Sequence, residues 1–284
     1  MDLSALNTPF LVLDRDKVQS NERKMRHRVD ALGVSFRPHV KTHKSIDVLR
    51  FLASMPSEQK ITVSTLREAR YFFENGVSDI MYGVAVTPQK LEDVADLIQR
   101  GAKLSIILDS PFMASEATRL GRELGVSFET FIEIDTDGHR SGIEPSDNDL
   151  LEIGEILSAG HGAELIGVMA HAGDSYDCAD TAAITDHAEL ERAQTVLAAK
   201  RLRSAGFECH QVSVGSTPTA TFARHLDSVT ELRAGVYAFQ DLFQAGLGVC
   251  SVEEIALSVM TTVIGHSKSK NRFIIDAGWM AMSR

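Results

Sequence analysis

LSIILDSPFMASEATRLGRELGVSFETFIEID (residues 104–135) contains two short apolar runs separated by a segment with helical periodicity. The runs are Leu104–Leu108 and Thr130–Asp135, and the helical segment spans residues 111–124. Two strands joined by a helix lie parallel, because the helix carries the chain back along the sheet before the second strand begins. This stretch therefore predicts a right-handed βαβ unit.

The same alternation of apolar runs and helical segments continues on both sides of this unit. Counting from Ser35, eight strand-like runs occur: Ser35–His39, Ile61–Ser64, Asp79–Gly83, Leu104–Leu108, Thr130–Asp135, Leu165–Ala170, Gln211–Gly215 and Glu231–Ala234. Eight parallel βα units close into a (β/α)8 barrel, the TIM barrel, and we predict that fold for residues 15–248. An open, doubly wound sheet is the alternative.

The pattern changes after about residue 250. Two β-like runs, Ile255–Ile264 and Arg272–Asp276, are joined by a polar turn with no helix between them. We interpret residues 1–14 and 249–284 as the start of a β-rich C-terminal domain that also takes the N-terminal strand. So few strands make a poor closed sheet, and we expect this domain to be truncated.

Composition narrows the class of protein. The 284 residues carry a formal net charge of −10 and no dominant basic face, which argues against nucleic-acid binding. Three widely spaced cysteines without a CxxC motif fit a reducing cytoplasm better than a disulfide framework. No signal peptide is recognisable, and no run approaches the roughly 20 apolar residues of a membrane span. We therefore expect a cytoplasmic protein that contacts neither nucleic acid nor membrane.

Reactive side chains follow the strand-like runs, where a (β/α)8 barrel places its active site. The run GSTPT (215–219) lies at a strand-to-helix turn, where glycine allows close approach and hydroxyl and N–H groups favour a phosphate. A plain helix cap is the alternative, because Ser and Thr before proline cap helices. Residues 235–237 follow the next strand and could close over the same anion.

The segment RPHVKTHKS (37–45) places Lys41 among other basic groups after the first barrel strand. Neighbouring cations lower the proton affinity of a lysine and make it a better nucleophile. A lysine of this kind together with a phosphate site suggests pyridoxal phosphate as cofactor. Two alternatives are that the basic residues only solvate a helix start, or that the barrel binds a phosphorylated metabolite without Schiff-base chemistry.

Six ordered segments carry a family resemblance: RPHVKTHK (37–44), IEIDTDGHRSGI (132–143), VMAHAGDSY (168–176), SVGSTPT (213–219), ELRAGVYAFQD (231–241) and IIDAGWMAMS (274–283). In order and spacing they resemble the D-threonine aldolase and D-serine dehydratase family. These are fold-type III pyridoxal-phosphate enzymes, distantly similar to alanine racemase, and the resemblance covers nearly the whole chain.

The resemblance implies a role for each matching residue. Lys41 is similar to the Schiff-base lysine, and we place it with His39 and His171 among the catalytic residues. Arg140 matches the arginine near the cofactor, and His171 and Tyr176 match residues that line the ring and substrate side. The phosphate cradle implied by the family consists of Gly215, Ser216, Thr217, Gly235 and Tyr237.

The implied activity is a lyase reaction on a β-hydroxy D-amino acid, with retro-aldol cleavage as the leading expectation. The alternatives are a D-serine or D-3-hydroxyaspartate dehydratase and a non-catalytic pyridoxal-phosphate protein. The family also implies a homodimer and a divalent metal such as manganese, magnesium or zinc, held by a His and an Asp or Cys. No His-x-Asp or His-x-Cys pair follows Asp276, so we expect no metal ligands in this chain.

Overall fold

The computed structural model of the chain describes residues 5–52, 59–138, 140–279 and 281. Eight parallel strands form one sheet in which sequential strands are neighbours and the last pairs with the first. They are β2 (Ser35–Pro38), β3 (Lys60–Val63), β4 (Asp79–Ala85), β5 (Lys103–Leu108), β6 (Phe128–Ile134), β7 (Ala163–Ala170), β8 (Gln211–Val214) and β9 (Glu231–Ala234). An isolated parallel bridge between His39 and Thr62 links the remaining edges, β2 and β3. The predicted (β/α)8 barrel is confirmed, and the open sheet is not observed.

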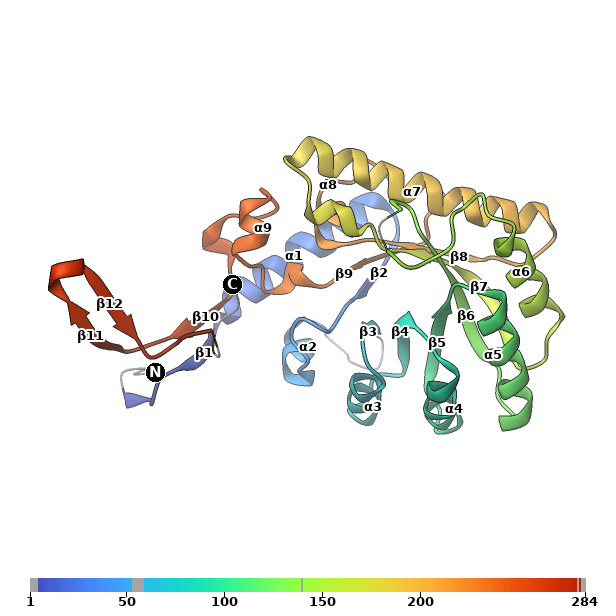
Figure 1. Cartoon of the computed structure of the whole chain (residues 1–284), viewed down its shortest axis with the longest axis horizontal. Helices are drawn as coiled ribbons and strands as arrows, with labels where there is room; N and C mark the ends of the chain where they lie inside the picture. The colour runs from blue at the N-terminus through green and yellow to red at the C-terminus, as the bar shows by residue number, and fades with distance from the viewer. Residues whose placement is uncertain (1–4, 53–58, 139, 280, 282–284) are drawn as a thin grey trace.

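Helices follow the strands and cover the outside of the barrel (Figure 1). They are α1 (Arg15–Leu32), α2 (Ile46–Leu52), α3 (Leu66–Glu74), α4 (Leu91–Gln99), α5 (Pro111–Leu124), α6 (Asp149–Ala159), α7 (Thr181–Ser204), α8 (Thr217–Phe222) and α9 (Leu242–Gly246). The bounds of α5 follow from local chemistry. Ser110 accepts a hydrogen bond from the Met113 N–H, Pro111 occupies the first turn, and Gly125 ends the helix in the left-handed region.

The barrel interior is apolar on one side and polar on the other. Met81, Ile107, Phe131 and Met169, from β4 to β7, form the apolar side. The polar side is a chain of hydrogen-bonded groups that we call the polar column, and it consists of the half-buried Asp79 and the buried Arg37, Glu231, Ser213 and Arg233. Each charge in the column has a charged or hydroxyl partner, as buried charges require. The column ends at Arg233, beneath the carboxyl ends of the strands.

The N-terminal strand joins the C-terminal segment, as predicted. β1 (Phe10–Leu13) pairs antiparallel with β10 (Leu257–Met260), and β11 (Val263–Ser267) pairs with β12 (Arg272–Ile275) in a hairpin that projects from the barrel (Figure 1). The prediction of one continuous run over Ile255–Ile264 is wrong, because the chain leaves β10 at Thr261. The Asp276 carboxylate accepts from the Thr261 hydroxyl at 2.7 Å and the Thr262 N–H at 2.9 Å, which separates β10 from β11.

None of the described helices combines the length and the apolar character needed to cross a bilayer.

Candidate active site

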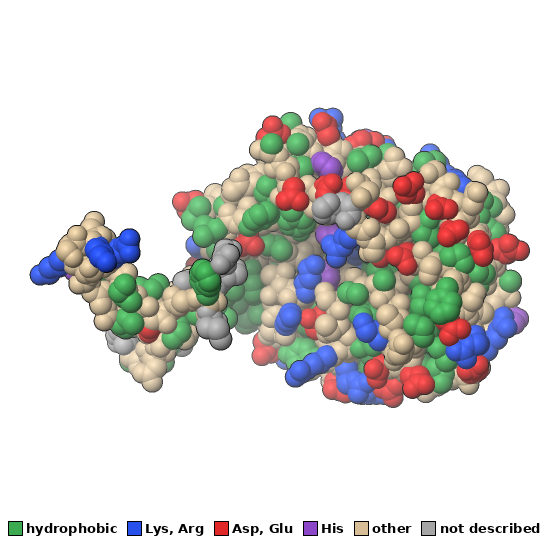
Figure 2. Space-filling view, in the orientation of Figure 1, with side chains coloured by type: hydrophobic (Ala, Val, Ile, Leu, Met, Phe, Trp, Pro, Cys, Tyr) green, Lys and Arg blue, Asp and Glu red, His purple; other side chains and the backbone are tan. Residues whose placement is uncertain are grey.

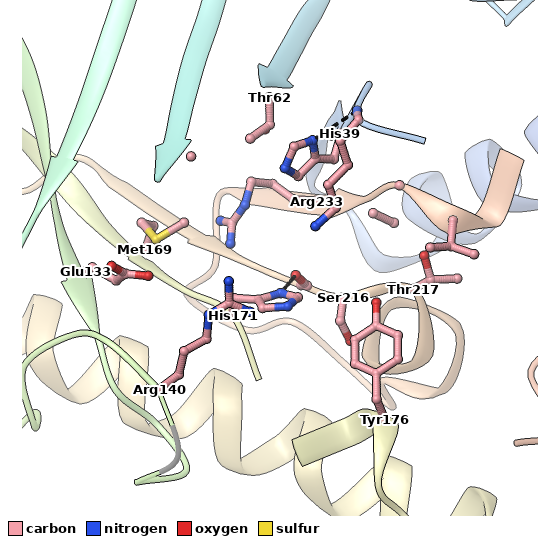
Figure 3. Close-up of a pocket in the computed structure, with 16 residues that line it drawn as sticks. His39, Thr62, Glu133, Arg140, Met169, His171, Tyr176, Ser216, Thr217 and Arg233 are labelled. Carbon is pink, nitrogen blue, oxygen red and sulfur yellow. Dashed lines mark hydrogen bonds between the residues drawn. The ribbon is translucent and has the colours of Figure 1, made fainter. Parts of the chain in front are cut away.

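A pocket opens at the carboxyl ends of the barrel strands (Figure 3). Figure 2 shows basic and histidine side chains gathered around a hollow on this face of the molecule. The pocket brings together all of the predicted site residues except Tyr237: His39, Lys41, Arg140, His171, Tyr176, Gly215, Ser216, Thr217 and Gly235. Residues from opposite ends of the chain therefore meet in one cavity.

Lys41 lies at the mouth of this pocket, in the loop between β2 and α2. Partial burial against the wall lowers the pKa of the Lys41 amine, and the positive charges of Arg140 and Arg233 lower it further. Glu68 opposes this shift. A lysine with a lowered pKa is more often a neutral amine at physiological pH, which is the form that acts as nucleophile or base.

His171 faces the pocket with one ring nitrogen already engaged. Its Nδ1–H donates to the Gly215 carbonyl at 3.1 Å, so Nε2 is left as the acceptor. Burial lowers the pKa of His171 to about 4, and the nearby charges of Arg233, Arg140 and Lys41 act in the same direction. The ring is therefore neutral near pH 7.

His39 is held in a similar way on the other side of the pocket. Its Nδ1 accepts from the backbone N–H of Lys41 at 3.4 Å, and its Nε2 lies 3.4 Å from the Ser64 hydroxyl. Burial, together with the positive charge of Lys41, lowers the pKa of His39 well below its ordinary value. The pocket thus contains two neutral histidines among cationic side chains.

Gly215 and Gly235 are glycines for steric reasons. Gly215 has φ +128°, and a Cβ there would lie 2.2 Å from the Arg233 carbonyl oxygen. A Cβ on Gly235 would lie 3.0 Å from the His39 carbonyl oxygen. A side chain at either position would therefore displace neighbouring backbone of the strand ends that border the pocket. The N–H of Gly215 donates to Glu191 at 2.9 Å, so Gly215 contributes space to the cradle, and its own N–H is already used.

The helix-cap interpretation of the GSTPT run is confirmed, and the phosphate-site interpretation stays a prediction. Ser216 caps α8 through a capping box, in which its hydroxyl accepts from the Thr219 N–H and the Thr219 hydroxyl accepts from the Ser216 N–H. The same residue and Thr217 also line the pocket. The capping box fixes the conformation of the turn, and the turn borders the pocket.

Tyr237, which the family motif predicts in the cradle, is not among the residues that line the pocket. Its buried hydroxyl donates to the Glu22 carboxylate of α1 at 2.7 Å, and its ring packs edge-on against Phe36. Residues 236–238 form a 3-10 turn after Gly235, and this turn directs the Tyr237 side chain toward α1. Only the backbone of Tyr237 approaches the cradle, where its N–H donates to the Thr217 hydroxyl.

Arg140 and Tyr176 reach the pocket from two loops. The Arg140 loop returns to its own strand, because the Ile143 N–H donates to the Glu133 carbonyl at 2.9 Å. Tyr176 ends the 3-10 turn Gly173–Tyr176, and its ring centroid lies 6.2 Å from that of His171. Burial raises the pKa of Tyr176 to about 12, so its phenol stays protonated and can donate a hydrogen bond.

Two buried charged residues of the pocket received no role from the motifs. Arg233, 4 % exposed, donates to the Ser213 hydroxyl at 2.7 Å and to the Ala170 carbonyl. Glu133 accepts from the Ser141 hydroxyl at 3.1 Å, and burial raises the pKa of its carboxyl group. A sequence signal for both exists, since each is a charged residue inside a strand of the barrel, where burial of a charge is costly.

The residues of this pocket fit pyridoxal phosphate. The cofactor has an aldehyde that takes a lysine amine, a phosphate that needs a cradle, and a ring nitrogen that needs a partner. Lys41 supplies the amine, the turn at Gly215–Thr217 with Gly235 supplies the cradle, and Arg233 and Arg140 are the nearby cations. For a metal, the described residues contain no group of three or more His, Cys, Asp or Glu side chains that could hold the ion.

Comparisons with known proteins agree with this geometry. Residues 13–242 match the family described as alanine racemase, N-terminal domain. D-threo-3-hydroxyaspartate dehydratase from Delftia sp. is 50% identical over 99% of this chain and 74% of that protein. D-serine dehydratase from Dictyostelium discoideum is 31% identical over 99% of this chain and 75% of that protein.

Solved structures extend the comparison. The Delftia dehydratase superposes with a TM-score of 0.95, covering 99% of this chain and 74% of the other. Alanine racemase from Clostridium difficile 630 shares the fold at 15% identity, with a TM-score of 0.73, over 92% of this chain and 66% of the racemase. The chain is therefore an enzyme of the alanine racemase N-terminal domain family, within the fold-type III pyridoxal-phosphate enzymes.

Proposed function

We propose that this enzyme is a pyridoxal-phosphate-dependent lyase for β-hydroxy D-amino acids, and that it dehydrates D-threo-3-hydroxyaspartate. The observation that carries the choice of reaction is the 50% identity to a dehydratase of that substrate over 99% of the chain. Retro-aldol cleavage, the leading expectation from the motifs, is the second candidate, because a 3-hydroxy-D-aspartate aldolase from Paracoccus denitrificans is 30% identical.

The pocket supports the proposal through its distribution of charge. Lys41 and Arg140 line its outer part together with His171 and Tyr176, and no carboxylate lies among the residues of that part. A cationic wall favours a substrate with two carboxylates, because each carboxylate that leaves water on binding gains a positively charged neighbour in the pocket. D-serine, with one carboxylate, would use less of this wall.

The roles of the protein groups follow from their protonation states. Lys41 binds the cofactor aldehyde and, as a neutral amine, accepts the proton from Cα of the substrate. His171 presents the acceptor nitrogen Nε2 toward the substrate side, where it holds the β-hydroxyl. Gly215, Ser216, Thr217 and Gly235 hold the phosphate. The bound cofactor supplies an electron-withdrawing ring that makes the Cα proton acidic.

We also propose that the reaction requires a divalent metal, as the family resemblance implies. One solved structure of a D-threo-3-hydroxyaspartate dehydratase is of a variant in the metal-free form. Since the described residues offer no cluster of ligands, we assign no metal-binding role to any of them.

Product analysis tests the proposal. The purified enzyme, loaded with pyridoxal phosphate, is incubated with D-threo-3-hydroxyaspartate, D-serine or D-threonine, with and without manganese. Dehydration eliminates water from the substrate, and hydrolysis of the product then releases the amino group as ammonia. D-threo-3-hydroxyaspartate therefore gives oxaloacetate and ammonia. Retro-aldol cleavage breaks the Cα–Cβ bond and gives glycine and glyoxylate.

We expect oxaloacetate and ammonia in equal amounts, with D-threo-3-hydroxyaspartate as the best substrate. Lys41→Ala is the control for chemistry at the pocket and should form neither product. Lys44→Ala should retain activity, because Lys44 is exposed and forms an ion pair with Glu68 outside the pocket. Glycine and glyoxylate as the main products would replace dehydration with the second candidate.

A further inference from the structure

Glu191 is a buried carboxylate beneath the candidate active site that does not line the pocket. It lies near the middle of α7 and is 2 % exposed. One carboxylate oxygen, Oε1, accepts from the backbone N–H groups of Ala172 at 3.0 Å and Gly215 at 2.9 Å. The other, Oε2, accepts from the Thr219 hydroxyl at 2.9 Å. A single side chain therefore holds the ends of two strands and the first turn of α8.

These contacts connect the phosphate cradle to the histidine of the pocket. Gly215 donates its N–H to Glu191 and accepts at its carbonyl from His171 Nδ1–H, while Ala172, next to His171, donates to the same Glu191 oxygen. These three hydrogen bonds, together with the peptide bond between His171 and Ala172, close a ring through Glu191, Gly215, His171 and Ala172. This ring determines where Gly215 lies and which nitrogen of His171 faces the cavity.

A buried carboxylate is costly to retain for packing alone. Removing an ionised carboxyl group from water is unfavourable unless hydrogen bonds and opposite charge compensate, and an apolar side chain of similar size usually packs at least as well. Glu191 has three such donors, and all three belong to segments that shape the pocket. Its partners therefore indicate a task at the site.

We propose that Glu191 is the positioning residue of the phosphate cradle, and that it acts through the Gly215 N–H and the Thr219 hydroxyl without touching the cofactor. This inference rests on the proposed assignment of pyridoxal phosphate to the pocket. Displacing the carboxylate should move Gly215 and the Ser216–Thr217 turn, and so weaken binding of the phosphate group more than binding of the ring.

The test compares the affinity of the enzyme for pyridoxal 5′-phosphate with its affinity for pyridoxal, which has the same ring and aldehyde but no phosphate. The ratio of the two dissociation constants isolates the cradle from the rest of the site and from general losses of stability. Both constants are measured by absorbance titration of the full chain stripped of cofactor.

Three variants are compared with the wild type. Glu191→Gln keeps the length and an acceptor oxygen for both N–H groups, and its amide can donate to Thr219, so the ratio should stay within about twofold. Glu191→Asp is one methylene shorter and cannot reach all three partners, so the phosphate preference should fall about tenfold, the effect of one lost buried hydrogen bond to a charged group. Glu189→Gln is the matched control on the same helix, because Glu189 is half-exposed and pairs with Arg192 on the surface.

Each outcome bears on a different claim. A wild type that binds both compounds equally would contradict the proposed cofactor site, whatever Glu191 does. A folded Glu191→Asp variant with the wild-type ratio would overturn the positioning role. A Glu191→Gln variant as impaired as Glu191→Asp would also overturn it, since geometry would then be preserved and only charge lost.

Discussion

The hydroxyl of Tyr237 contacts Glu22 in the barrel wall, whereas its backbone N–H contacts Thr217 beside the cradle. Its contact partner, Glu22, lies 215 residues earlier in the chain, and Glu22 also accepts from Arg26 in the same helix. The burial of this pair raises the pKa of Tyr237 well above its ordinary value, so the phenol stays a donor. The tyrosine therefore fastens α1 to the end of β9.

Tyr237→Phe should separate stability from cofactor binding. Removing the hydroxyl leaves a buried Glu22 oxygen without its donor, which should lower the free energy of unfolding by about 1–3 kcal/mol. Affinity for pyridoxal phosphate should stay within about twofold of the wild type, the range in which a residue outside the site leaves binding unchanged. Urea unfolding and absorbance titration measure the two quantities. A large loss of cofactor affinity in a folded variant would return Tyr237 to the cradle.

At the scale of elements, α5 packs very closely against the loop that precedes β7. A Cβ on Gly121 would lie 1.9 Å from the Gly162 carbonyl oxygen, and a Cβ on Gly162 would lie 2.3 Å from the Thr118 carbonyl oxygen. Backbone contacts backbone here, so neither segment can yield by turning a side chain. This packing sets the distance between α5 and the strand that carries His171.

Gly121→Ala should therefore destabilise the barrel, even though alanine favours a helix. Forced displacement of packed backbone typically costs about 1–3 kcal/mol, which exceeds the gain of roughly 1 kcal/mol from helix propensity. Ser115→Ala, at an exposed position of the same helix, is the control and should change stability little. Urea unfolding of both variants gives the comparison, and a Gly121→Ala variant as stable as the control would show that the loop moves freely.

For the whole molecule, buried neutral histidines make stability depend on pH. Burial lowers the pKa of both His43 and His171 to about 4. The unfolded chain binds protons on these groups near their ordinary pKa of about 6.5, while the folded chain does not, so stability is present above pH 6.5 and falls as the pH drops toward 4. Acid should therefore unfold the barrel and disturb the pocket together.

His43→Asn should reduce this dependence. Between pH 7.5 and 5.5 each such histidine costs the wild type about 1.4 kcal/mol of unfolding free energy, so the variant should lose about that much less. Guanidinium unfolding at both pH values measures the difference. Equal losses in the variant and the wild type would mean that His43 is not neutral in the folded barrel. The assembly of the chain into a homodimer also stays a prediction, and sedimentation of the purified protein would test it.

The sequence by itself determined the barrel, the location of the candidate site and most of the residues that line its pocket. Strand and helix periods are local, and a parallel barrel brings the ends of all its strands to one face, so His39, Lys41, His171 and Gly215 had to meet there. Lys41 among basic neighbours and the GSTPT turn are also local patterns, and each carries its own chemistry.

The tertiary structure alone decided the direction of Tyr237, the ends of β10 and β11, and the burial of Arg233, Glu133 and Glu191 at the candidate site. Each of these depends on a partner that the local pattern does not specify: Glu22 for Tyr237, Asp276 for the break at Thr261, and Gly215 for Glu191. A buried polar group must find a donor or acceptor wherever the fold places one, and that choice is made only when distant segments pack together.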